Sequence, residues 1–112
     1  MSNKVYVFTA PTGRFNVDSA AQYGEIEYVT LPKGANYFNT DTVMDLLGER
    51  LAEYDPDADF LAVTGQSMLV ALGTGLVLAD FGRVRLLLFD ARTGRYVERT
   101  VHHPGFSEGK NQ

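Results

Sequence analysis

Residues 59–102 read DFLAVTGQSMLVALGTGLVLADFGRVRLLLFDARTGRYVERTVH, and this stretch decides the fold class. Its two apolar runs, residues 60–63 and 84–89, lack the polar alternation of half-exposed strands, which is typical of parallel strands with both faces covered. The segment between them is long enough for one helix, and such crossovers between parallel strands are right-handed. We therefore expect a βαβ unit.

Shorter patterns on both sides extend this unit. The sequence DARTG at residues 90–94 predicts a hairpin turn with Gly94 in a left-handed conformation, followed by an antiparallel strand over residues 96–102. Residues 4–9 are rich in Val, Tyr and Phe and predict one further strand, and residues 24–31, GEIEYVTL, predict another with a polar start. Between them we expect a loop with one helical turn, at Asp18–Gln22.

Residues 40–54 predict an amphipathic surface helix, with Thr42 and Asp45 as a capping-box-like pair at its start. The expected architecture is one compact α/β domain over residues 1–102. It has a mixed sheet of four or five strands, two main helices and a C-terminal βαβ unit closed by a hairpin, and a flexible polar tail follows at residues 103–112. The core residues expected from the βαβ unit are Leu61, Val63, Leu72, Leu76, Val84, Leu86 and Leu88.

Length and composition restrict the class of protein. The chain has 112 residues, enough for one domain with a core, and no cysteine, so disulfides, thiol catalysis and cysteine-based zinc sites are excluded. Its start shows no apolar region of signal-peptide length, and the longest apolar run is too short to span a bilayer. We expect a cytoplasmic protein, in the host cytoplasm if a phage encodes it, and no membrane association.

The segment Ser67–Phe81 predicts a helix with almost no polar face. A helix that is apolar on every side is expected to be buried on every side, and a small chain offers little to cover it. Small residues recur at i, i+4 spacing along it, at Ser67, Ala71, Gly75 and Ala79, which favours close packing. We therefore expect a homodimer through this helix region, which would keep side chains such as Leu69 and Val77 out of water.

One candidate anion site lies where the first apolar strand meets this helix. Backbone N–H groups at a helix start, beside the hydroxyls of Thr64 and Ser67, bind phosphate or carboxylate in many α/β proteins. Gly65 and Gln66 complete this turn, and Arg14 in the loop TAPTGR could meet the same anion. The structural alternative is a simple turn and helix cap, because no Walker lysine or dinucleotide-binding glycine motif is present.

Five arginines give the C-terminal hairpin a basic character, and they make nucleic-acid binding a further alternative. They are Arg83, Arg85, Arg92, Arg95 and Arg99. Charges at the solvated edge of a sheet, where they block edge pairing, explain these residues equally well.

The other charged motifs point away from metals and cofactors. Asp55, Asp57 and Asp59 open like a calcium loop, but the later positions of an EF-hand loop are not met, so we expect a solvated acidic turn. His102 and His103 are adjacent in a strand and point to opposite faces. We expect no metal, no cofactor and no catalytic residue.

The C-terminal 40 residues resemble a pattern found in short proteins of unknown function from tailed phages. Thr64-Gly65, Gly82, Val84, Phe89-Asp90 and Tyr96 match this pattern in order, with a small-residue helix between the first two elements. The resemblance implies a phage-type accessory protein and no particular activity. The function we expect is that of a small non-catalytic interaction protein, cytosolic or phage-encoded, which assembles as a homo-oligomer. The alternatives are an anion- or nucleotide-binding domain, with or without hydrolytic activity, and a nucleic-acid-binding protein.

Overall fold

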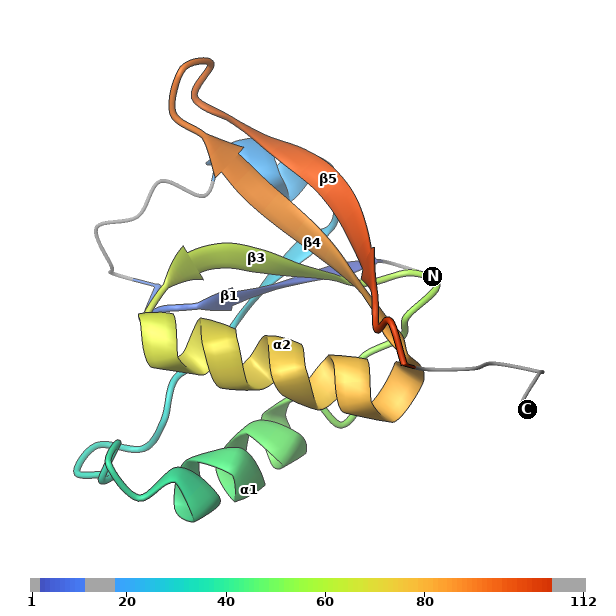
Figure 1. Cartoon of the computed structure of the whole chain (residues 1–112). Helices are drawn as coiled ribbons and strands as arrows, with labels where there is room; N and C mark the ends of the chain where they lie inside the picture. The colour runs from blue at the N-terminus through green and yellow to red at the C-terminus, as the bar shows by residue number, and fades with distance from the viewer. Residues whose placement is uncertain (1–2, 12–17, 106–112) are drawn as a thin grey trace.

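Five strands form one mixed sheet, in the spatial order β2-β1-β3-β4-β5. The computed structural model describes residues 3–11 and 18–105 (Figure 1). The strands are β1 (Lys4–Phe8), β2 (Glu25–Tyr28), β3 (Phe60–Gly65), β4 (Arg83–Asp90) and β5 (Arg95–His102). The helices are the short 3-10 helix η1 (Asp18–Gln22) and the two α-helices α1 (Thr40–Arg50) and α2 (Ser67–Phe81). The α/β class, the mixed sheet and the two main helices are as expected.

The first four strands are parallel, and β5 returns antiparallel to β4. Gly94 has a φ of 72° in the hairpin turn, as expected. The chain passes from β1 out to the edge strand β2 and then returns past β1 to β3, so the strand order reverses between β1 and β3. In open α/β sheets, the crevice at such a reversal is the usual place for a ligand.

The two faces of the sheet carry separate cores. Both α-helices cover one face, below the sheet in Figure 1, where Tyr6, Phe8 and Leu61 pack with residues of α1 and α2. The opposite face carries Val5 and Val7, which pack with Ala20 of η1. Because side chains alternate along a strand, neighbouring residues of β1 enter different cores.

Helix α1 begins one residue after its N-cap Asn39, whose side-chain oxygen accepts a hydrogen bond from the Thr42 backbone N–H at 3.2 Å. The expected capping pair of Thr42 and Asp45 is therefore wrong. The helix starts earlier in the chain, so Thr42 lies within its first turn and supplies the N–H that the cap satisfies.

Helix α2 spans the predicted residues, but it is buried on one side only. Leu69, Gly73 and Val77 face the core, with Leu69 and Val77 only 1% and 2% exposed. The small residues Ser67, Ala71, Gly75 and Ala79 all face solvent. The expectation that Leu69 and Val77 need a second subunit to keep them out of water is wrong, because α1 and the sheet of the same chain bury these two side chains.

Two of the residues expected in the core are exposed. Leu61 and Val84 are buried, and Leu72, Leu76 and Leu86 pack partly against the same core. Val63 and Leu88 are instead 38% and 39% exposed. Helix α2 packs against β3 and β4, and the sheet twists the far end of the β4–β5 hairpin away from it (Figure 1). One helix is too narrow to cover that part of the sheet.

Candidate functional site

The turn from β3 into α2 is held against the end of β1. Gly65 has a φ of 113°, and a Cβ at this position would lie 2.1 Å from the Phe8 carbonyl oxygen, so only glycine fits. The next residue, Gln66, donates its backbone N–H to the same carbonyl at 2.8 Å. The glycine predicted to make a turn therefore also allows two strand ends to meet.

The amides at the start of α2 are satisfied by the chain itself. The side-chain oxygen Oε1 of Gln66 accepts hydrogen bonds from the Met68 and Leu69 N–H groups, at 2.8 and 3.3 Å. The Thr64 hydroxyl accepts a hydrogen bond from the Tyr96 hydroxyl at 2.9 Å. The structure thus brings Thr64, Gly65, Gln66 and Ser67 together at one turn, with two of the helix-start amides already used by a neutral acceptor.

A crevice of about 450 Å³ lies beside this turn, at the carboxyl ends of β1, β2 and β3. This is the point where the strand order reverses. Its lining is mainly apolar with a few hydroxyl and amide groups, from Phe8, Thr9, Ala10, Thr30, Tyr37, Gly65, Gln66 and Leu69. Arg14, the proposed cation for this site, lies outside the described residues. Sequence reasoning missed Thr30 and Tyr37, because only the strand order shows that the segment after β2 reaches this edge.

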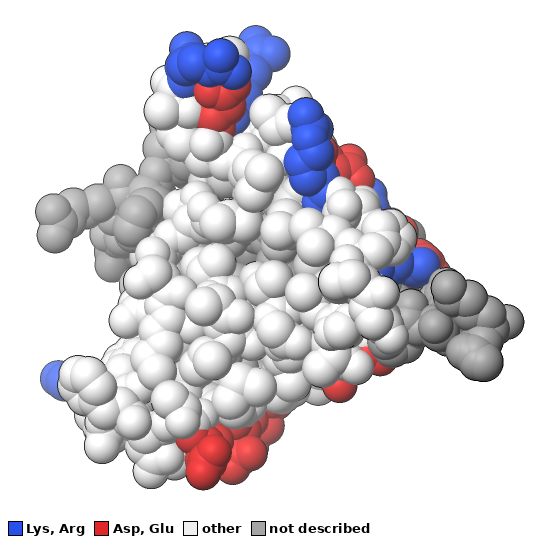
Figure 2. All heavy atoms as spheres, viewed as in Figure 1, with Lys and Arg blue, Asp and Glu red and all other residues white. Residues whose placement is uncertain are grey.

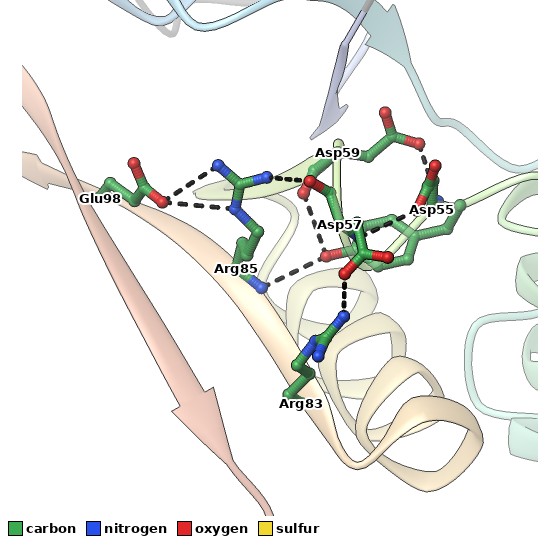
Figure 3. A network of polar contacts seen from close by, with 7 residues as sticks. Asp55, Asp57, Asp59, Arg83, Arg85 and Glu98 are labelled. Atoms are coloured by element: carbon green, nitrogen blue, oxygen red, sulfur yellow. Dashed lines mark hydrogen bonds and ion pairs between the residues drawn. The ribbon is translucent and has the colours of Figure 1, made fainter.

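At the opposite end of the parallel strands, two of the five hairpin arginines are engaged in a polar network (Figure 3). Arg83 forms an ion pair with Asp57, and Arg85 forms one with Glu98 at 3.2 Å. Arg85 also donates to the Asp57 carbonyl at 2.9 Å and lies over the Phe60 ring at 4.1 Å from its centroid. Both side chains connect β4 to the loop before β3 through Asp57, and Arg85 also connects β4 to β5 through Glu98.

The acidic turn at residues 55–59 is part of the same network. The Asp59 carboxylate, 4% exposed, accepts hydrogen bonds from the Lys4 and Asp55 backbone N–H groups, both at 2.9 Å. The Tyr54 hydroxyl donates to the Asp59 carbonyl and accepts from the Arg85 N–H, both at 3.2 Å, and burial raises the pKa of Tyr54. Asp59 is therefore a structural carboxylate that joins this turn to β1.

The three remaining arginines lie along the hairpin. Arg92 pairs with Asp90 at 3.3 Å, and its hydrogen bonds lower the pKa of Asp90. Arg95 and Arg99 are exposed and lie on the α2 side of β5, since Arg99 stands opposite Leu86 in the sheet register. Among the ion pairs of the described residues, none involves these two side chains.

A continuous uncharged surface lies over α2 and the neighbouring sheet. We call it the α2 face, and it consists of Ser67, Ala71, Gly75 and Ala79 on the helix and Val63, Leu88 and Val101 on the strands. A Cβ at Gly75 would have nothing within 4 Å, so the chain's own packing does not require glycine there. Figure 2 shows this side of the molecule as a broad white area between charged groups at its two ends.

Metal ligands do not gather in the described part of the chain, where no group of three or more His, Asp or Glu residues could hold an ion. None of the helices within residues 3–11 and 18–105 is both long and apolar enough to cross a bilayer.

The family model described as Phage Pam3 gp32-like protein matches residues 3–103. The chain belongs to this family. The resemblance of its C-terminal 40 residues to short phage proteins is thereby confirmed, and the match extends over all five strands and both α-helices. Searches of curated proteins and of solved structures found no match. The family places the chain among phage proteins and names no activity.

Proposed function

We propose that this phage protein is a non-catalytic interaction protein that assembles as a homodimer through the α2 face. The observation that carries the proposal is the outward row of small residues on α2, flanked by exposed valine and leucine side chains of the sheet. Contiguous exposed apolar surface of this kind marks interaction sites in soluble proteins. Two backbones approach closely where side chains are small, which makes a second helix a suitable partner.

The use of the polar clusters supports a structural, non-catalytic role. Asp59, Tyr54 and Arg85 are engaged with backbone groups of neighbouring elements. Gln66 caps its own helix. These groups hold neighbouring elements together within the chain, whereas the exposed small and apolar residues of the α2 face serve no such contact.

A glutamate at Gly75 tests the homodimer. The position is open to solvent in the single chain, and glutamate is a better helix former than glycine, so the variant is expected to fold. Size-exclusion chromatography with light scattering should give a dimer for the unmodified chain and a folded monomer for Gly75→Glu. The matched control is Ala21→Glu, an exposed position of η1 on the opposite face, which should remain dimeric. Equal masses for all three proteins would refute the proposal.

The crevice beside Gly65 favours a second candidate, the binding of an anion or nucleotide, with or without hydrolysis. Its support is its place at the strand-order reversal and the hydroxyl groups of Thr30 and Tyr37 in its lining. Thermal unfolding with phosphate, adenosine or ATP tests it, because a ligand of the folded state raises Tm. The rise should shrink in Tyr37→Phe, and no rise with any of the three compounds would reject this candidate.

Arg95 and Arg99 carry a third candidate, nucleic-acid binding, because they are exposed and unpaired with carboxylates among the described residues. Retention on immobilised DNA or RNA that falls steeply with salt would support it. The double variant Arg95→Ala/Arg99→Ala should then lose retention. Elution of the unmodified chain at low salt would reject the candidate.

A further inference from the structure

The charges at the two ends of the α2 face have opposite sign. At the hairpin end, Arg95 and Arg99 lie on the α2 side of β5, the same side of the sheet as Val101. At the other end, α1 exposes Asp41, Asp45 and Glu49. In Figure 2 the blue groups over the hairpin and the red groups at the α1 end are separated by the uncharged surface.

Neither set is neutralised within the chain. The ion pairs among the described residues use Lys4, Arg83, Arg85 and Arg92, and none includes a carboxylate of α1 or the side chains of Arg95 and Arg99. A partner that covers the α2 face therefore meets unpaired arginines at one end and unpaired carboxylates at the other. A second copy of this chain carries both, and complementary charges fix the orientation in which two surfaces meet.

Two orientations are open to a face-to-face dimer with two-fold symmetry. An axis perpendicular to α2 would place the helices antiparallel and bring each hairpin end against the other hairpin end, so arginine would face arginine. An axis parallel to α2 would place the helices parallel and bring the hairpin end of each copy over the α1 end of the other. Only the second arrangement pairs opposite charges, and it does so twice because the contact is symmetric.

We infer that two copies pack with their α2 helices parallel, and that Arg95 and Arg99 of each copy lie against the carboxylates of α1 in the other. This inference rests on the proposed homodimer and specifies its geometry. The small residues of α2 allow the two helices to approach, and in the parallel arrangement each residue of the row faces its own copy. In the antiparallel arrangement, Ser67 would face Ala79 of the partner.

Single cysteines distinguish the two orientations, because the chain contains no cysteine of its own. Ser67→Cys and Ala79→Cys place a thiol near each end of the row, and both positions are exposed. In a parallel pair both variants should form disulfide-linked dimers on mild oxidation. In an antiparallel pair like residues at the ends would be about 18 Å apart, at about 1.5 Å of rise per residue. A disulfide needs Cα atoms about 4.4–6.8 Å apart.

Each result is decisive. Cross-linking of both single variants supports the inference. Cross-linking only in a mixture of the two variants would overturn the parallel orientation and leave the homodimer standing. A dimer that none of these cysteines cross-links would assign the interface to another face and overturn both the inference and the proposed α2-face homodimer, and so would a monomeric unmodified chain.

Charge reversal gives an independent reading. Arg95→Glu/Arg99→Glu and Asp45→Lys/Glu49→Lys should each weaken the dimer about tenfold or more, since both symmetric contacts then oppose like charges. Asp41 is left unchanged because it lies in the first turn of α1, where a negative charge favours the helix. Mixing the two variants should restore a heterodimer with the affinity of the unmodified protein. Two reversed variants that associate as tightly as the unmodified chain, or a mixture that stays monomeric, would overturn the pairing.

Discussion

Replacing Asp59 by asparagine tests whether the acidic turn is structural. Each carboxylate oxygen accepts one backbone N–H, from Lys4 and from Asp55, both at 2.9 Å. Asparagine keeps only one acceptor oxygen, and its NH2 group would oppose the other N–H donor. Hydrogen bonds to a charged acceptor contribute about 1.5–3 kcal/mol, and the site is almost fully buried. We therefore expect the free energy of unfolding to fall by about 2 kcal/mol.

Urea denaturation measures this change. With slopes of about 1–3 kcal/mol per molar urea, the midpoint of Asp59→Asn should fall by about 1 M, at equal protein concentration and with an unchanged slope. The matched control is Asp57→Asn, whose side chain is 79% exposed and pairs with Arg83. Exposed ion pairs contribute below about 1 kcal/mol, so its midpoint should scarcely move. Equal midpoint shifts in the two variants would refute the structural role of Asp59.

The remaining predictions concern pH, the core and the cap of α2. Burial, with a contribution from the Asp59 carboxylate, raises the pKa of Tyr6 from 10.0 to about 12. The unfolded chain therefore loses this proton first, so the contribution of Tyr6 to stability should be constant below about pH 9 and fall between about pH 10 and 12, and stability should fall less over this range in Tyr6→Phe. Leu87→Ala should cost about 2–5 kcal/mol, because Leu87 is fully buried, and Leu86→Ala should cost less, because Leu86 is only partly buried. Gln66→Ala should lower the free energy of unfolding by about 1 kcal/mol, because the Met68 and Leu69 N–H groups lose their acceptor. If sulfate then stabilises this variant more than it stabilises the unmodified chain, the freed N–H groups bind anions.

The local sequence patterns were sufficient to predict most of the elements. The limits of α2 follow from Gly65 and Gly82 at its two ends, and the hairpin follows from the DARTG turn. These signals act over a few residues, so they do not depend on how distant parts of the chain meet. Local patterns were not sufficient at the start of α1. Asn39 and Thr42 are both suitable N-cap residues, and only the observed first residue of the helix distinguishes them.

Whether a side chain is buried, exposed or paired depends on contacts between distant elements, which the local sequence does not show. Val63 and Leu88 have the composition of core positions, but the twist of the sheet carries them beyond the edge of α2. Val77 and Gly75 are two positions apart on the same apolar helix, and only the packing of α1 and the sheet shows which of them faces outward. Arg83 and Arg85 differ from Arg95 and Arg99 because the loop with Asp57 lies beside β4, a contact between distant parts of the chain that the local sequence does not show.

The most direct test of the central claim is the mass of the unmodified chain in solution. Sedimentation equilibrium at micromolar concentration should give twice the 12.4 kDa of one chain, because we propose that a second copy covers the α2 face. The dimer should weaken as salt is added, since charged groups border the face. A mass of 12.4 kDa at micromolar concentration and low salt would contradict the account.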